Sequence, residues 1–197
     1  MQRFYLVSLI LLGAFFTQAQ GSKFDRRRVF IGSGINLGFF NGFVLGLNPE
    51  AGYTVGKILD VGVATNFSYI TQNYINSPAT DRLFTYGGGP FLRIWPANMF
   101  FISGQLEYNQ ISFSTKNNGV VFNQVRYSAP SLLVGGGYGS RMIGQSQFYT
   151  SLMVDVLGDP QSPYVDQFQR MQPVFRTAFT FYLKGKQNRS SVSRPVY

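Results

Sequence analysis

The sequence predicts an all-β fold, an eight-stranded antiparallel transmembrane up-and-down β-barrel. Beyond residue 28, eight segments of about ten residues alternate between apolar side chains and small or polar ones, which is the period of a β-strand. The apolar faces carry bulky Phe, Leu, Ile and Tyr, whereas the opposite faces are mostly Gly, Ala, Ser, Thr and Asn. The connections between segments alternate between short and long, as in a barrel that crosses an outer membrane.

Each expected strand is justified by the side chains that recur on its apolar face. Asn41-Gly42 separates the first two strands as a tight hairpin turn. In chain order the apolar faces hold Val29, Ile31, Ile35, Leu37 and Phe39; Phe43, Leu45, Leu47, Ala51, Tyr53 and Val55; Val61, Val63, Phe67 and Tyr69; Phe84, Tyr86, Leu92 and Ile94; Phe100, Ile102, Leu106 and Tyr108; Leu132, Val134 and Tyr138; Phe148, Leu152, Val154 and Val156; and Phe175, Phe179, Phe181 and Leu183.

Composition limits the chemistry available to the chain. It has 197 residues, 17 Lys plus Arg against 8 Asp plus Glu, and a formal charge of +9. Because there is no Cys and no His, disulfides, thiol catalysis, zinc sites and imidazole bases are excluded. We expect no cofactor, no metal site and no catalytic residue.

The N-terminus predicts export. Residues 1–19 read as a signal peptide, with a basic start, an apolar run from Phe4 to Phe16 and a small-residue cleavage site ending at Ala19. Thirteen apolar residues fall short of the roughly 20 that a membrane-spanning helix needs. The remaining chain divides into a basic periplasmic segment (20–28), the outer-membrane barrel (29–183) and a basic periplasmic tail (184–197).

The alternating pattern fits two environments. In a soluble sandwich or lipocalin-like barrel the apolar face points inward, whereas in an outer-membrane barrel it meets lipid and the polar face fills the lumen. The interior of an eight-stranded barrel is only just wide enough for side chains to fill it. The bulky faces exceed that space and the small faces fit it, so the sequence favours the membrane orientation.

Five charged residues fall on the small, polar faces. This is the arrangement expected when the other face meets hydrocarbon, where a charge costs roughly 2 to 4 kcal/mol. Facing carboxylates and guanidinium groups either line a narrow water path or form an internal salt-bridge plug, and the narrow interior favours the plug. This predicted lumen charge network comprises Glu50, Arg93, Glu107, Asp155 and Arg176.

Connection lengths predict the orientation. Those around Lys57, at 96–98 and at 140–146 are short, whereas 71–83, 114–126 and 158–172 are long. An even number of strands places both termini on one side, and short turns are typical of the periplasmic side. We therefore expect both termini in the periplasm and the long connections outside the cell.

Several short runs resemble a known family. The runs Leu47–Tyr53, Asp60–Val63, Gly88–Trp95, Asp155–Asp159 and Ser162–Tyr164 are similar to segments of the small, porin-like outer-membrane β-barrel proteins of Bacteroidota. The resemblance covers the barrel and implies an outer-membrane address in a Gram-negative cell. It carries over no catalytic residue. The basic extension after Leu183 departs from the family pattern.

Basic residues outside the predicted lumen are candidate contacts for lipid or a partner. They do not form one stripe with stacked aromatic residues, so nucleic acid is not an expected partner. The expected partners are outer-membrane lipid, lipopolysaccharide and a periplasmic or outer-membrane protein. The candidates are Lys184, Lys186, Arg189 and Arg194 in the tail, and Arg82, Lys116, Arg126 and Arg170, which the pattern places on outer loops.

Three function classes follow from the sequence. The favoured one is a non-enzymatic barrel that serves as a structural or accessory component of the cell envelope, including a subunit of a type IX secretion or gliding assembly. A lipid-A-modifying barrel enzyme is an alternative, although such enzymes commonly depend on His and this chain has none. A small-solute channel is the other, and a filled lumen disfavours it.

Overall fold

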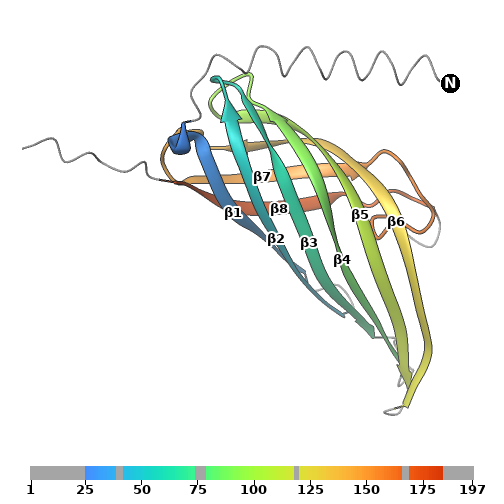
Figure 1. The fold of residues 1–197 in the computed structure, drawn as a ribbon. Coiled ribbons are helices and arrows are strands. Elements are labelled where there is room, and N and C mark those ends of the chain that lie inside the picture. Colours follow the sequence, from blue (N-terminus) through green and yellow to red (C-terminus); the bar gives the residue numbers. More distant parts are fainter. Residues whose placement is uncertain (1–24, 39–41, 74–78, 118–119, 166–168, 184–197) are drawn as a thin grey trace, which may run out of the picture.

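A computed structural model describes residues 25–38, 42–73, 79–117, 120–165 and 169–183. Eight antiparallel strands form one closed barrel in which each strand pairs with its neighbour in sequence and β8 pairs with β1 (Figure 1). A single turn of 3-10 helix, η2 (Arg26–Arg28), precedes them. The strands are β1 (Val29–Gly38), β2 (Gly42–Val55), β3 (Leu59–Asn73), β4 (Ala79–Ile94), β5 (Phe100–Asn117), β6 (Val120–Gly139), β7 (Gln147–Asp155) and β8 (Val174–Tyr182).

The apolar face of every strand points out of the barrel. In β5, for example, the exposed Ile102 and Leu106 alternate with the buried Ser103, Gln105 and Glu107. The same period of two holds in β7 and β8, where buried and exposed positions also alternate. The predicted all-β, eight-stranded, antiparallel up-and-down barrel is confirmed, and so is the assignment of bulky side chains to its outer surface.

Aromatic side chains fill the interior where small residues leave room. Phe30 packs against Phe91 and Tyr182, and Trp95 packs against Phe101 and Tyr149. Each cluster depends on glycine in an adjacent strand. A Cβ added to Gly52 would meet the Phe30 ring, and one added to Gly137 would meet the Phe101 ring and the Thr150 carbonyl.

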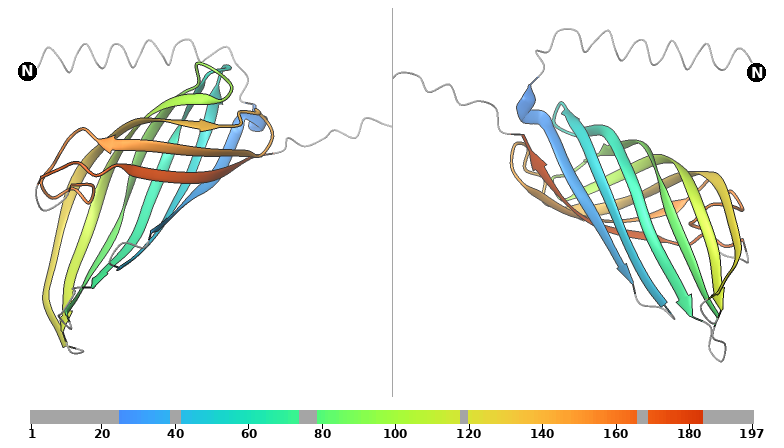
Figure 2. Two further views of the ribbon diagram at one scale, coloured as in Figure 1. Left: turned by 180° about the vertical axis from the view of Figure 1, so that it is seen from behind. Right: turned by 60° about the horizontal axis from the view of Figure 1, so that its bottom comes forward.

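The strands differ in length, so one side of the barrel wall extends farther than the other. β5 and β6 have 18 and 20 residues, whereas β7 and β8 have 9 each. β6 pairs with β7 only from Leu133 to Gly139. Residues 79–86 of β4, 108–117 of β5 and 120–131 of β6 continue beyond the closed wall and form what we call the projecting sheet (Figures 1 and 2).

The projecting sheet corrects the predicted long connections. Segments 71–83 and 114–126 are mostly strand, since β3 reaches Asn73, β4 begins at Ala79, β5 reaches Asn117 and β6 begins at Val120. The sequence pattern marks each strand only as far as its apolar face continues, but backbone hydrogen bonding extends beyond that point, where Arg82, Ser114 and Lys116 interrupt the outer face. Of the three, only 158–172 lies between strands as expected, and its described residues belong to the β7–β8 loop, which we define as residues 156–165 and 169–173.

The two ends of the described chain lie side by side. The Leu183 amide donates to the Val29 carbonyl at 2.9 Å, so both termini leave the same end of the barrel. The predicted signal peptide (1–19), residues 20–24 of the N-terminal segment and the tail (184–197) lie outside the described residues. Within the described ranges, no helix is long and apolar enough to cross a membrane.

Close packing at glycine generates a test of the interior. We expect Gly137→Ala to lower the free energy of unfolding by about 1 to 3 kcal/mol, because its methyl group overpacks against Phe101. Gly104→Ala is the matched control, since its added Cβ meets nothing within 4 Å. Urea unfolding in detergent, followed by fluorescence of the single Trp95, measures both. Equal unfolding midpoints for the two variants would contradict the packing described.

Candidate functional site

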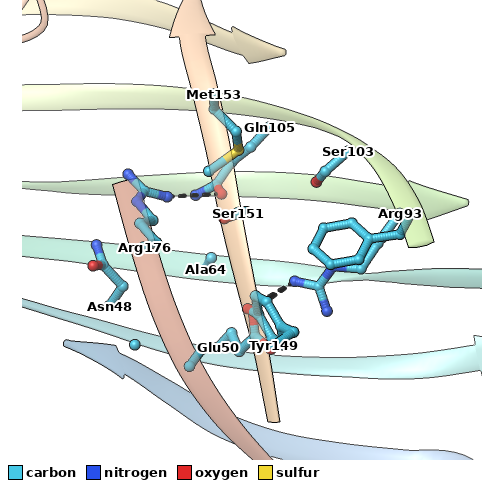
Figure 3. Close-up of a pocket in the computed structure, with 13 residues that line it drawn as sticks. Asn48, Glu50, Ala64, Arg93, Ser103, Gln105, Tyr149, Ser151, Met153 and Arg176 are labelled. Atoms are coloured by element: carbon cyan, nitrogen blue, oxygen red, sulfur yellow. Dashed lines mark hydrogen bonds and ion pairs between the residues drawn. The ribbon is translucent and has the colours of Figure 1, made fainter. Parts of the chain in front are cut away.

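The centre of the lumen holds an ion pair between β2 and β4. The Arg93 Nη2 atom lies 3.1 Å from Glu50 Oε2, and both side chains are at least nine-tenths buried. The Tyr149 hydroxyl donates to the same carboxylate oxygen at 2.7 Å and accepts from Arg93 at 2.8 Å (Figure 3). The guanidinium also lies over the rings of Tyr149, Phe91 and Phe101, at 4.1 to 5.1 Å from their centroids.

A second ion pair joins β5 to β8. Arg176 Nη2 lies 2.9 Å from Glu107 Oε1, and Arg176 Nη1 donates to the Gln105 side chain at 3.0 Å (Figure 3). The same carboxylate accepts from Gln105, Asn109 and the Tyr164 hydroxyl, the last at 2.7 Å. A buried carboxylate with this many donors is fully compensated for the water it has lost.

Tyr164 reaches into the lumen from the β7–β8 loop. Its hydroxyl donates to Glu107 and accepts from Asn66 and Arg176. Burial raises the pKa of the Tyr164 phenol above its ordinary value, so the hydroxyl keeps its proton. Through Tyr164 the loop closes the lumen and is hydrogen-bonded to β3, β5 and β8.

A third ion pair closes the end from which the termini leave. Arg141, in the β6–β7 turn, binds Asp60 of β3 through two hydrogen bonds of 2.8 and 3.1 Å. The carboxylate also accepts from the Trp95 indole at 2.7 Å and from the Thr54 hydroxyl at 2.8 Å. Tyr182 of β8 bonds Thr54 in turn at 2.9 Å.

Asp155 is held differently from the other lumen carboxylates. It is fully buried at the end of β7 and accepts from the Ser162 hydroxyl at 2.6 Å and from the Leu132 and Leu157 backbone amides. It forms no ion pair within the described residues. The structure therefore joins four members of the predicted lumen charge network as two separate pairs, and places Asp155 apart as an anchor for the β7–β8 loop.

Sequence reasoning missed the Asp60–Arg141 pair. The sequence pattern places Asp60 only in a family-like run and Arg141 only in a short turn. The alternation of side chains along the strands could have predicted that both point inward. Asp60 shares the inward face of Gly62 and Ala64, and Arg141 continues the inward face of Gly137 and Gly139. Tyr164 had no such signal, because a loop has no period.

A small cavity separates the central pair from the Glu107–Arg176 pair. Its volume is about 20 Å³, and its lining includes Glu50, Arg93, Tyr149, Gln105 and Arg176. Three buried atoms on the side chains that line it have no hydrogen-bond partner in the described part of the protein: Glu50 Oε1, Arg93 Nε and Arg176 Nε. One water molecule needs roughly 10 to 15 Å³ and two or more polar partners, so the cavity suits a single water rather than a path for solutes.

The lumen offers little for catalysis or metal binding. No group of three or more His, Cys, Asp or Glu side chains in the described part of the chain is placed to hold a metal ion. Glu50, Asp60 and Glu107 are each committed to an arginine, and Asp155 to Ser162 and two amides. The arrangement neutralises and fills the interior.

The candidate contact residues outside the lumen divide into groups. Arg82, Lys116 and Arg126 lie on strands of the projecting sheet, and the prediction that they occupy outer loops is wrong. Strands continue through these positions because the hydrogen-bonded ladder does not require an apolar face. Arg170 is exposed on the β7–β8 loop. Lys184, Lys186, Arg189 and Arg194 lie outside the described residues.

Together, the fold and the site define a closed, eight-stranded β-barrel with an apolar outer surface and an interior filled by paired charges. Among solved structures, the crystal structure of Ail, the attachment invasion locus protein of Yersinia pestis, is similar, with a TM-score of 0.41 and 14% identity over 77% of this chain and 91% of Ail. Ail in complex with the heparin analogue sucrose octasulfate gives a TM-score of 0.41 and 13% identity over 77% and 92% of the two chains. This likeness concerns the fold alone. No family model and no curated protein matches the sequence.

The central ion pair generates a stability test. We expect Arg93→Ala to lower the free energy of unfolding by about 3 to 5 kcal/mol, because it leaves Glu50 buried without a counter-charge. The double variant Glu50→Gln with Arg93→Met loses less, since no charge remains unpaired. Arg82→Ala, at an exposed position, is the control and changes stability by less than about 0.5 kcal/mol. The readout is the urea midpoint in detergent, and an unchanged midpoint for Arg93→Ala would refute the argument.

Proposed function

We propose that the chain is an integral outer-membrane β-barrel that acts as a non-enzymatic structural or accessory component of the cell envelope. The observation that carries this proposal is the apolar belt, the set of large outward-facing side chains around the barrel. Every strand contributes: Ile31 and Ile35; Leu45 and Leu47; Val63 and Phe67; Phe84, Tyr86, Leu92 and Ile94; Phe100, Ile102, Leu106 and Tyr108; Val134 and Tyr138; Phe148, Leu152 and Val154; Phe175, Phe179 and Phe181.

The apolar belt is too continuous for a surface that faces water. Soluble monomers rarely expose contiguous apolar patches beyond a few hundred Å². Here the belt residues are each more than a third exposed, while the described acidic residues of the strands lie in the interior or on the inner face. Acyl chains around the belt relieve this exposure. The inverted pattern supports a membrane location, and the predicted signal peptide supports export to it.

The orientation follows from the same proposal. The end with the termini carries the turns between β2 and β3, β4 and β5, and β6 and β7, whereas the opposite end carries the longest connection, the β7–β8 loop, together with the projecting sheet. Short turns are typical of the periplasmic side of outer-membrane barrels. We place both termini in the periplasm and the projecting sheet, with the β7–β8 loop, on the outer side.

The closed lumen supports a role other than transport. Three ion pairs cross the interior at successive levels, and the cavity between two of them, at about 20 Å³, has room for roughly one water molecule. A lipid-modifying activity needs a general base or nucleophile near the lipid, and the chain has neither His nor Cys. Its lumen carboxylates face inward: Glu50, Asp60 and Glu107 are each paired with an arginine, and Asp155 is held by Ser162 and two backbone amides. A structural or accessory role therefore fits the side chains better than either alternative.

Membrane insertion has a direct test. We expect Leu106→Arg, within the apolar belt, to destabilise the lipid-embedded barrel by about 2 to 4 kcal/mol, because the charge would face hydrocarbon. Gln145→Arg, in the exposed β6–β7 turn, is the control and leaves stability unchanged within about 0.5 kcal/mol. Unfolding is measured in lipid vesicles. A mature protein that folds in water without detergent or lipid would overturn the proposal.

The accessory role is tested by co-purification. If the barrel is a subunit of an envelope assembly, such as a type IX secretion or gliding apparatus, extraction in mild detergent recovers a stoichiometric envelope protein with it. We expect deletion of residues 184–197 to reduce that recovery several-fold, because the basic tail offers the charges for a periplasmic contact. Gln161→Ala, at an exposed position of the β7–β8 loop, serves as the control. Recovery of lipid alone would favour a solitary structural barrel.

A further inference from the structure

We propose that the outward face of the projecting sheet binds the phosphate groups of lipid A in the outer leaflet. The site consists of Arg82 on β4, Lys116 on β5 and Arg126 on β6, with the polar and aromatic side chains between them. This inference rests on the proposed outer-membrane location and adds to it the chemical class of ligand that one face of the barrel recognises.

The strand register brings the three cations to one face. In the β4–β5 ladder Arg82 is opposite Ser114 and Lys116 is opposite Thr80, and in the β5–β6 ladder Arg126 is opposite Ser112. Ser112, Ser114 and Lys116 alternate along β5 on the same side as the exposed Tyr108 and Leu106. Three adjacent strands therefore each present one positive charge outward within a few residues of the same level.

No carboxylate of the described strands competes for these charges. The described acidic residue nearest in sequence, Asp81, lies on the opposite face of β4, where the Thr115 hydroxyl donates to it at 2.8 Å. Every other Asp or Glu of the described strands is buried in the lumen. Within the described residues none of the three cations forms an ion pair, so each can neutralise an external anion.

The cations stand directly beyond the aromatic rim of the apolar belt. Along β4 the outward side chains run Arg82, Phe84, Tyr86, so the sequence passes from charge to aromatic ring in steps of two residues. The two rings lie 5.9 Å apart. A ligand that fits this order has an anionic group next to a hydrocarbon body, as a lipid does. A free anion or a soluble polymer would contact the cations but not the aromatic and apolar side chains beside them.

A hollow marks where the headgroup would rest. It has a volume of about 250 Å³ and is lined by Phe84, Tyr86, Gln110, Ile111, Ser112 and Arg126. Gln110 and Ser112 offer neutral donors beside the Arg126 guanidinium, a combination suited to phosphate oxygens and to the hydroxyl groups of a sugar. The Tyr108–Ser128 hydrogen bond of 2.8 Å fixes the neighbouring outer side chains of β5 and β6.

The test is direct binding of lipid A to the full mature barrel in detergent micelles. We compare bisphosphorylated lipid A with the same lipid after enzymatic dephosphorylation, by native mass spectrometry and by titration. The variant carries Arg82→Gln, Lys116→Gln and Arg126→Gln. We expect its affinity for lipid A to fall about tenfold or more, because several charge-assisted hydrogen bonds are lost, and wild-type protein to bind the dephosphorylated lipid equally weakly.

A matched variant controls for net charge. Arg26→Gln, Arg27→Gln and Arg28→Gln remove the same three charges at the other end of the barrel, and its affinity for lipid A stays within about twofold. The proposal is overturned if the two variants lose affinity equally, if Arg82→Gln, Lys116→Gln and Arg126→Gln leave affinity unchanged, or if lipid A binds as well without phosphate. Displacement of lipid A by millimolar inorganic phosphate would instead assign the face to a free anion and also overturn it.

Folding and insertion are checked on the same samples. All three substituted side chains lie outside the lumen, so heat-modifiable gel mobility and the fluorescence of the buried Trp95 should match the wild type. Variants that insert normally but bind lipid A like the wild type defeat this inference and leave the proposed location intact. A protein that never requires detergent defeats the location itself.

Discussion

Closing eight strands into a ring is the constraint from which the other features follow. The ring is narrow, so its interior admits side chains and little else. With the bulky side chains outside, every polar group on the inner face must find a partner within that confined space. The pairs Glu50–Arg93, Glu107–Arg176 and Asp60–Arg141 meet most of this requirement, and the atoms left without a protein partner belong largely to the side chains around the small cavity. The glycines beside Phe30 and Phe101 leave room for the aromatic rings that fill the remaining space.

Buried ion pairs are poor evidence of stability, because apolar residues of the same volume often serve as well. Their value here lies in register. Each pair spans the lumen between elements that are not neighbours, as Glu107 on β5 and Arg176 on β8 do. Shifting one strand by a single residue would turn its charge outward and its bulky side chain inward. The pairs therefore disfavour misaligned barrels that backbone hydrogen bonding alone would tolerate.

The period of two made the faces, the strand count and the inward position of Glu50 and Arg93 predictable from sequence. The strand ends were not predictable, because the alternation that marks a strand fades where the outer face becomes polar. β5 nevertheless continues to Asn117, and β6 begins already at Val120. The partners of each charge depend on strand stagger, which no local pattern encodes. That is why Asp155 was grouped with the arginines but binds Ser162, and why Tyr164 went unnoticed.

The pairing of β1 with β8 closes the barrel, and it requires the last strand of the chain. β1 and β8 pair over only six residue pairs, from Phe30–Tyr182 to Ile35–Thr177, at the largest sequence separation in the fold. β8 also carries Arg176, for Glu107, and Tyr182, for Thr54. Closure of the ring and pairing of Glu107 with its arginine therefore both require the last strand of the chain. A nascent chain lacking its final strand holds an unpaired carboxylate and two open sheet edges, which makes it a natural substrate for a chaperone or protease.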